Sequence, residues 1–237
     1  MDRFSDLPDA LLAEILSYLL TKVSGKTSLL SKRWEFVWLK VPALDVSLND
    51  FPNNPLNALH RVVNKFLEFN KDSRMQKFKL HYLYERNNND HLVEWIDTAV
   101  ARGVQHLHVE TLKSADVTQN IYKSKTLVSL KLVCVGLETP RCKVSLPCLK
   151  IMHLEDVWYI YDPLLVEKMI MGSPVIEELP LISRRPMLPD ICDRDVVKNM
   201  CVRSQTLKTF RLVFQKIWGG RNFSVEIDAP RLEYHML

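Results

Sequence analysis

The sequence predicts an α/β solenoid, in which a curved parallel sheet carries outer helices, preceded by a small all-α module. Two observations indicate this fold class. One apolar pattern recurs six times between residues 75 and 212, and two helical patterns rich in leucine and tryptophan precede it within residues 6–40. The chain has 237 residues, which is enough for one small module and one larger domain.

The recurring pattern is an apolar residue, two variable positions, an apolar residue, one variable position and an apolar residue. The six copies are MQKFKL from Met75, VQHLHV from Val104, LVSLKL from Leu127, LKIMHL from Leu149, IEELPL from Ile176 and LKTFRL from Leu207. Their starts differ by 29, 23, 22, 27 and 31 residues, close to the leucine-rich-repeat period of roughly 20 to 29. We therefore predict one strand per copy, paired in parallel with its neighbours.

The fourth and sixth residues of each copy alternate as a half-buried strand requires. The fourth residues should then form one buried column: Phe78, Leu107, Leu130, Met152, Leu179 and Phe210. Helical patterns over residues 57–69, 91–103 and 163–173 predict return helices between strands, as in a solenoid. An unrelated α/β domain with parallel strands is the alternative, and six matching copies argue against it.

Residues 6–20 predict a first helix, because Pro8 suits a first helical turn and the apolar residues Leu11 and Ile15 lie four apart. Residues 26–40 predict a second helical segment, in which Trp34 and Trp38 share a face. Such a module is too short to hold a good core alone. Its apolar side chains must be buried against the rest of the chain or a partner.

LPDALLAEIL and TSLLSKRW, with a tryptophan four residues on, resemble the F-box of plant F-box/leucine-rich-repeat proteins over residues 3–42. HLVEWIDTAVARGVQHLHVE, GSPVIEELPL and VEIDAPRLEYHML resemble the repeats of that family. The resemblance implies docking on a Skp-type adaptor, which joins the F-box to a cullin and a RING subunit. It implies that part of the adaptor contact comes from Leu7, Pro8, Leu11 and Ile15. The rest of the contact, or the support of the helices, is implied for Leu30, Ser31, Arg33, Trp34 and Trp38.

Three positions depart from the family pattern. Leu20 stands where a proline is usual, and Val23 stands where an acidic residue is usual. Gly25 lies within the second helix, where glycine costs up to ~1 kcal/mol relative to alanine. These departures predict a frayed helix and a weakened adaptor affinity.

We place the F-box module at residues 1–45, a linker with a connecting helix at 46–74, and about six repeats at 75–237. The boundary follows from the turn-rich stretch between Asn49 and Pro55. Longer relatives carry more repeats and often an FBD domain. No FBD domain or polar cap is visible here, which favours a truncated relative.

Composition argues against several classes of protein. The net charge is only +4, so we expect no nucleic-acid partner, and Lys77, Lys79 and His81 read as a solvated face. No stretch approaches the roughly 18 apolar residues of a membrane span, and the acidic start does not resemble a signal peptide. We therefore expect no membrane association and a location in the cytoplasm and/or nucleus. The five cysteines form no CxxC pair and should be free thiols.

The sequence contains no GxGxxG, GxxxxGK[ST], HExxH or GxSxG motif. We therefore expect no catalytic residues, no cofactor and no metal. His106 and His108 lie two apart with Glu110 nearby, but no second pair completes a zinc site. We interpret them as surface histidines.

The fifth residue of each repeat should face the concave surface, where solenoids usually bind their partners. This central column is Lys79, His108, Lys131, His153, Pro180 and Arg211. It holds no acidic residue, so an acidic or phosphorylated target segment could bind its five polar members. Two alternatives remain open. In one, the polar residues serve solubility alone; in the other, target contact falls to Val133, Ile182 and Val213 in the flanking column.

The sequence thus predicts a non-catalytic substrate-recognition subunit of an SCF-type (Skp–cullin–F-box) ubiquitin ligase, with a protein target of unknown identity. The alternative is a protein-binding scaffold, or a vestigial truncated relative that no longer engages the adaptor.

Overall fold

The computed structural model describes residues 7–52, 55–69, 71, 73–82, 90–160, 164–184, 199–214 and 224–236. Within these residues, nine strands form one parallel sheet. The neighbours along it are β1 (Ala43–Ser47), β2 (Lys77–Tyr82), β3 (His106–Val117), β4 (Ser129–Glu138), β5 (Ile151–Glu155), β7 (Glu178–Ser183), β9 (Thr209–Phe214) and β11 (Tyr234–Met236). The short β6 (Trp158–Ile160) pairs with the far end of β4. The described part is therefore an α/β repeat fold.

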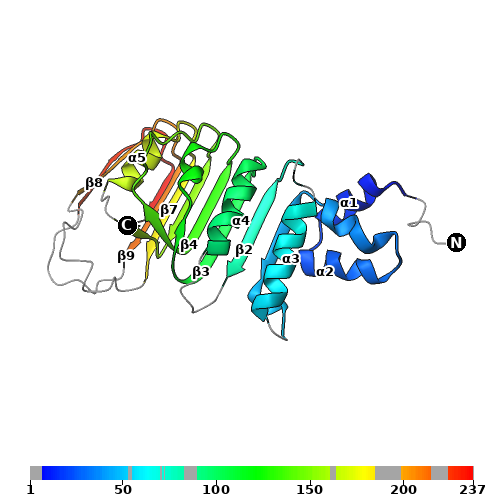
Figure 1. Cartoon of the computed structure of the whole chain (residues 1–237). Helices are drawn as coiled ribbons and strands as arrows, with labels where there is room; N and C mark the ends of the chain where they lie inside the picture. The colour runs from blue at the N-terminus through cyan, green and yellow to red at the C-terminus, as the bar shows by residue number, and fades with distance from the viewer. Residues whose placement is uncertain are drawn as a thin grey trace.

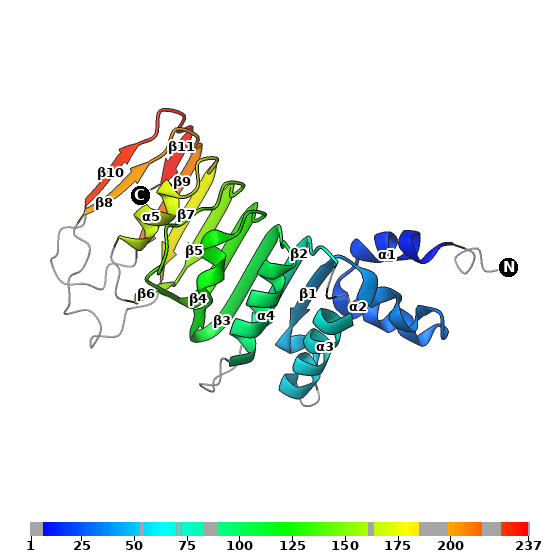
Figure 2. The ribbon, with the colours of Figure 1, turned by 45° about the horizontal axis from the view of Figure 1, so that its top comes forward.

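Helices cover one face of this sheet, as Figures 1 and 2 show. They are α3 (Pro55–Phe69), α4 (Asp90–Ala101) and α5 (Leu165–Met171), with the 3-10 helix η4 (Gln119–Lys123) between α4 and α5 in the chain. We call the opposite face of the sheet the open face. None of the described helices is long and apolar enough to cross a membrane.

The predicted register of the sheet is confirmed. Phe78 lies opposite Leu107, which lies opposite Leu130, and Leu179 lies opposite Phe210. All six members of the predicted column are at most 1% exposed. The register is well determined because a slip by one residue would turn every apolar side chain of a strand to the open face.

The sheet starts one strand earlier than predicted. β1 pairs with β2, and Leu44 of β1 extends the buried column opposite Phe78. Val41, Leu44 and Val46 fit the repeat pattern, but this copy starts 34 residues before Met75, outside the usual interval. The proposed module boundary at residue 45 therefore falls inside the first strand of the sheet.

In the last repeats, the described residues form two further strands outside the main sheet. β8 (Asn199–Arg203) and β10 (Ser224–Asp228) pair in parallel as a second, two-stranded sheet. The backbone N–H of Cys201 in β8 donates to the Glu167 carboxylate of α5 at 2.7 Å, so β8 lies beside the helical layer. The four described cysteines are free, as predicted, and Cys192 lies outside the described residues.

The N-terminal module consists of short helices beside the first strand. They are α1 (Asp9–Ser17), α2 (Thr21–Lys26) and the 3-10 helices η1 (Thr27–Leu29) and η2 (Trp34–Lys40), and a third 3-10 helix, η3 (Leu48–Asp50), follows β1. The Ser24 hydroxyl donates to the Leu16 carbonyl at 3.0 Å, and the Thr21 hydroxyl accepts from the Asp45 N–H at 2.8 Å. These bonds fix α2 between α1 and the sheet.

Candidate functional site

The N-terminal module exposes many apolar side chains. On α1, Leu12 and Leu16 are buried, whereas Leu11 and Ile15 on another side of the helix are 47% and 43% exposed. The exposed apolar set of the module is Leu11, Ile15, Leu19, Leu20, Val23, Leu29 and Leu30. An apolar surface of this kind is typical of protein–protein contact sites. The helices therefore have one apolar side in the core and a second that is exposed.

Most of the residues implied in adaptor binding belong to the accessible surface. Pro8, Leu11, Ile15, Leu30, Ser31 and Arg33 are exposed, and Leu7 is half-buried. Trp34 and Trp38 differ, since each is only 8% exposed and packs in the core. Two roles were implied for these tryptophans, adaptor contact or support of the helices, and their burial favours the support of the helices.

Arg33 ties the start of α1 to η2. Its guanidinium donates to the Leu7 carbonyl and lies 3.3 Å from the Asp9 carboxylate. Lys40 contacts the same carboxylate at 2.6 Å. The hydrogen bond from Lys40, with a smaller contribution from Arg33, lowers the pKa of Asp9. Arg33 thereby fixes the segment that presents Pro8 and Leu11.

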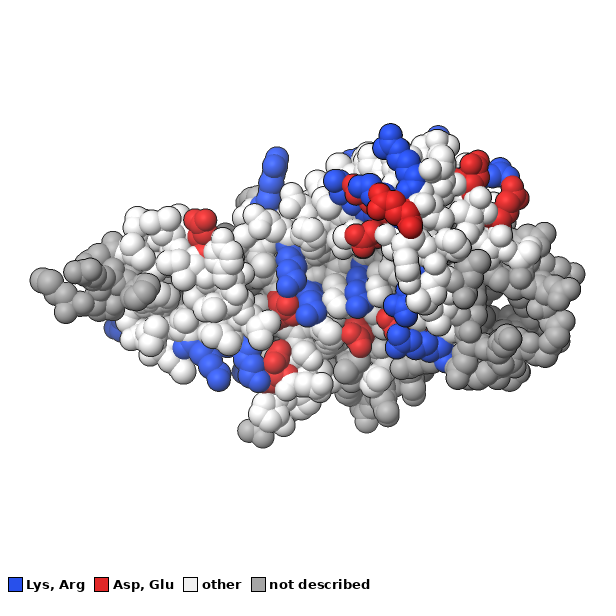
Figure 3. Space-filling view, turned by 180° about the vertical axis from the view of Figure 1, so that it is seen from behind, with Lys and Arg blue, Asp and Glu red and all other residues white. Residues whose placement is uncertain are grey.

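The open face carries the predicted central column. The register aligns Lys79, His108, Lys131 and His153 across β2 to β5, and Pro180 with Arg211 across β7 and β9. Figure 3 shows this face, with Lys and Arg side chains along its middle and Asp and Glu side chains among them. The predicted residues thus share one surface.

The column is less basic than the sequence analysis expected. Asp45 of β1 lies opposite Lys79 and pairs with it at 3.4 Å and with Lys77 at 2.8 Å. The prediction of a column without acidic residues is therefore wrong, because its first strand was missed. Within the described residues, Lys131 and Arg211 make no ion pair, so they carry the unbalanced positive charge of the column.

The column histidines contribute little charge at neutral pH. Burial, reinforced by Lys131 and other nearby cations, lowers the pKa of His108 to about 3. Burial also lowers the pKa of His153, although Glu155 at 3.1 Å opposes that shift. Both imidazoles are therefore neutral at pH 7, and they act as hydrogen-bonding groups or metal ligands rather than as cations.

The flanking column offers little apolar surface. Val133 is 9% exposed and Ile182 is 6% exposed, whereas Val213 is half-buried. Val133 of β4 and Ile182 of β7 therefore have little accessible surface with which to contact a target.

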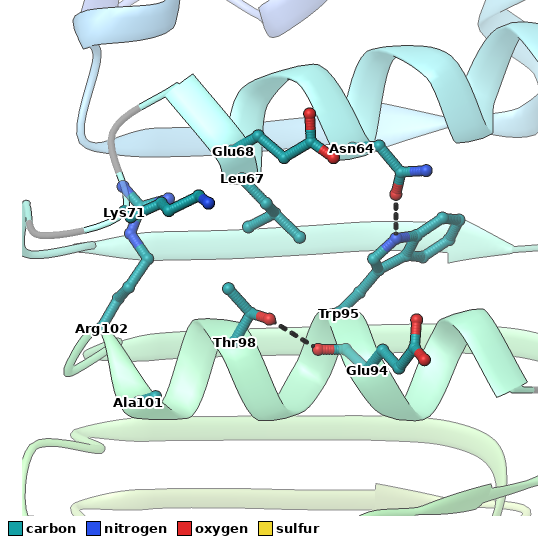
Figure 4. A pocket seen from close by; sticks show the side chains of 9 residues that line it. All are labelled: Asn64, Leu67, Glu68, Lys71, Glu94, Trp95, Thr98, Ala101 and Arg102. Atoms are coloured by element: carbon teal, nitrogen blue, oxygen red, sulfur yellow. Dashed lines mark hydrogen bonds between the residues drawn. The ribbon is translucent and has the colours of Figure 1, made fainter.

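A groove of about 420 Å³, which the sequence did not predict, lies between α3 and α4 (Figure 4). Trp95 donates to the Asn64 side chain at 2.6 Å, and the Thr98 hydroxyl donates to the Glu94 carbonyl at 2.8 Å. Arg102 at its end donates to Ser73, and burial lowers the pKa of its guanidinium. The bonds of Trp95 and Arg102 link α4 to α3 and to the segment at Ser73, whereas the Thr98 bond lies within α4. Among the described residues, no histidine, cysteine or serine lines the groove.

Comparison with known proteins agrees with this architecture. Residues 4–44 match the F-box domain, and residues 92–237 match the family described as FBD-associated F-box protein At5g56370, LRR repeats. No solved structure matches the chain.

Three similar proteins come from Arabidopsis thaliana. F-box/FBD/LRR-repeat protein At2g26030 is 52% identical over 238 residues, which cover 98% of this chain and 52% of the relative. Putative F-box/FBD/LRR-repeat protein At5g44950 is 50% identical over 241 residues, which cover 98% of this chain and 52% of the relative. F-box/FBD/LRR-repeat protein At5g44980 is 48% identical over 238 residues, which cover 98% of this chain and 54% of the relative. The chain spans about half the length of these relatives, and it belongs to the plant family of F-box/leucine-rich-repeat proteins.

Proposed function

We propose that this chain is the non-catalytic substrate-recognition subunit of an SCF-type ubiquitin ligase in the cytoplasm and/or nucleus. The F-box binds a Skp-type adaptor, which connects it to a cullin and a RING subunit, and the solenoid of repeats binds a target protein. The observation that carries the proposal is the exposed apolar set of the F-box module. The chain contributes proximity: it holds a target lysine near a charged conjugating enzyme, which raises their effective concentration.

The contact between the module and the repeats supports this role. Phe36 of η2 stacks on Phe69 of α3, with ring centroids 5.9 Å apart and planes inclined by 8°. Trp38 packs on Phe66 at 6.4 Å, and the Lys65 ammonium lies 5.3 Å from the Phe36 ring. Aromatic contacts of this kind resist hinge motion between the two parts. A bound target would therefore lie at a fixed place relative to the adaptor.

The test is a titration of the purified chain with a Skp-type adaptor. Changing Ile15 and Leu30 together to serine should weaken binding more than tenfold, because losing two apolar contacts at an interface centre costs ~2 kcal/mol or more. Met171→Ser on α5 is the matched control, since Met171 is an apolar side chain, 77% exposed, outside the module. Equal affinities for the double variant and the control would refute the proposed docking surface.

The alternative is a protein-binding scaffold that no longer engages an adaptor. It is favoured by the exposure of Leu20 and Val23, at 61% and 44%, where the family usually has a proline and an acidic residue. If the folded wild-type chain does not bind the adaptor in the same titration, this alternative replaces the ligase role.

A further inference from the structure

Three potential metal ligands meet on the open face. His81 of β2 lies opposite Glu110 of β3, and His108 of β3 lies opposite Lys79, two positions back along β2. One ligand atom from each of His81, His108 and Glu110 lies within 4.8 Å of the other two. Spacing along the sequence did not group these residues, since it associated His108 with His106 instead.

The distances suit a small tetrahedral ion. His81 Nδ1 lies 3.0 Å from Glu110 Oε2, and His108 Nε2 lies 4.0 Å from the same oxygen. Ligand atoms bound tetrahedrally to zinc at ~2.0–2.1 Å are ~3.3 Å apart. The two observed distances bracket this value, so small rotations of the side chains would complete the geometry.

One ligand atom has no other role. His108 Nε2 is buried and has no hydrogen-bond partner. A buried nitrogen without a partner is unfavourable and calls for an explanation in a folded protein. A metal ion bound to this nitrogen would give it a partner.

The surrounding charges permit a cation despite the nearby lysines. Lys79, on one side of His108, is paired with Asp45 at 3.4 Å. Glu110 contributes a negative charge to the ligand set itself. Lys131, on the other side, has no ion pair among the described residues. Its ammonium would therefore lie beside the metal and favour an anionic group as the fourth ligand.

We propose that His81, His108 and Glu110 form a zinc-binding site on the open face, with a fourth position left for water or for a carboxylate of a bound protein. Two imidazoles, one carboxylate and an open position are a ligand set that zinc accepts. The site belongs to the β2–β3 pair of strands alone. Metal binding is therefore independent of whether the F-box engages an adaptor.

The test is a zinc titration of the reduced, metal-free full chain in competition with a chromogenic chelator. Each of Glu110→Gln and His108→Gln should weaken zinc binding by at least about tenfold, since even the loss of outer-shell partners can cost that much. His153→Gln is the matched control, because His153 occupies the same column and contacts its own carboxylate, Glu155, at 3.1 Å. Titration with Co²⁺ provides a second readout through the visible absorption of the bound ion.

Two results would overturn the proposal. If the wild-type chain does not take zinc from the chelator, the site is excluded. If the wild type and Glu110→Gln bind zinc equally well, the metal belongs to cysteines or other histidines. Glu110 is 32% exposed, so its amide variant should fold, and circular dichroism of each variant checks this. Binding retained by His153→Gln and lost by Glu110→Gln would establish the site.

Discussion

Replacing Gly25 by alanine should stabilise the F-box module. Gly25 lies inside α2, and a Cβ atom at this position would meet nothing within 4 Å. Its φ angle is not positive, so alanine fits the same backbone without strain. Alanine is favoured over glycine in a helix interior by ~0.8–1 kcal/mol. For a chain of this size, that gain should raise the melting temperature by ~2–4 °C in scanning calorimetry.

The same change should affect adaptor binding. α2 positions η1, whose Leu29 is 85% exposed, and the Ser28 hydroxyl donates to the Gly25 carbonyl at 2.6 Å. If docking requires an ordered α2, stabilising that helix by ~1 kcal/mol increases adaptor affinity by at most about fivefold. A titration of both proteins with the adaptor measures this increase.

Gly172→Ala is the control with the opposite sign. A Cβ at Gly172 would lie 2.7 Å from Val144 Cγ1 and 2.8 Å from the Val144 carbonyl oxygen. The Leu146 N–H donates to the Gly172 carbonyl at 2.8 Å, which holds the two segments close together. Overpacking of this kind costs ~1–3 kcal/mol. A lower melting temperature for Gly25→Ala, or shifts of the same sign for both variants, would refute this reasoning.

Three further predictions have defined outcomes. Val133→Asp should destabilise the fold by ~2 kcal/mol or more because it buries a carboxylate, whereas Lys131→Glu on the same strand should change stability by ~0.5 kcal/mol or less. Denaturant titration of both variants tests whether Val133 points inward and Lys131 outward. Similar losses of stability in the two variants would contradict these orientations. Phe36→Ala should cost ~0.5–1.5 kcal/mol through the lost aromatic stack, and an unchanged unfolding midpoint would show that the stack contributes nothing. Burial, and secondarily His91, holds the pKa of His60 below its ordinary 6.5. The unfolded chain therefore takes up the proton more readily, and the free energy of unfolding should fall as the pH drops below that value. His60→Gln should reduce this loss in thermal melts across the acidic range, and an identical pH profile would argue against His60 as its source.

The architecture of the sheet was predictable because strand alternation has a period of two. In LVSLKL and LKTFRL, the apolar fourth and sixth residues exclude a slip by one residue, and the structure pairs these copies with their neighbours position by position. The strand around Leu44 was missed although its pattern fits. The 3-10 helix η3 and the 15-residue α3 lengthen that first interval, so spacing alone did not join this strand to the series.

The contacts of the candidate sites were less predictable. Which face of an amphipathic helix packs and which stays free depends on the neighbouring elements. The sequence therefore left open whether Trp34 and Trp38 contact the adaptor or support the helices, and in the structure both are buried. Clusters across strands raise a different difficulty. His81 meets Glu110, and Asp45 meets Lys79, through pairing between segments about 30 residues apart. The register between these strands cannot be derived from the sequence until every strand has been identified.

The distribution of charge relocates the expected target contact along the open face. Near β1 and β2, Asp45 pairs with both Lys77 and Lys79 and neutralises one of their two charges, so this end attracts an acidic segment less than two unpaired lysines would. Toward β5, the Glu155 carboxylate pairs with His153 at 3.1 Å and with Arg184 at 3.4 Å. Lys131 of β4 and Arg211 of β9 remain without ion pairs among the described residues. Because charges in water act over only ~8 Å at physiological salt, each of these two cations attracts an acidic group locally. A target held by charge would therefore bind over β4 to β9, and its affinity would depend on Lys131 and Arg211 more than on Lys79.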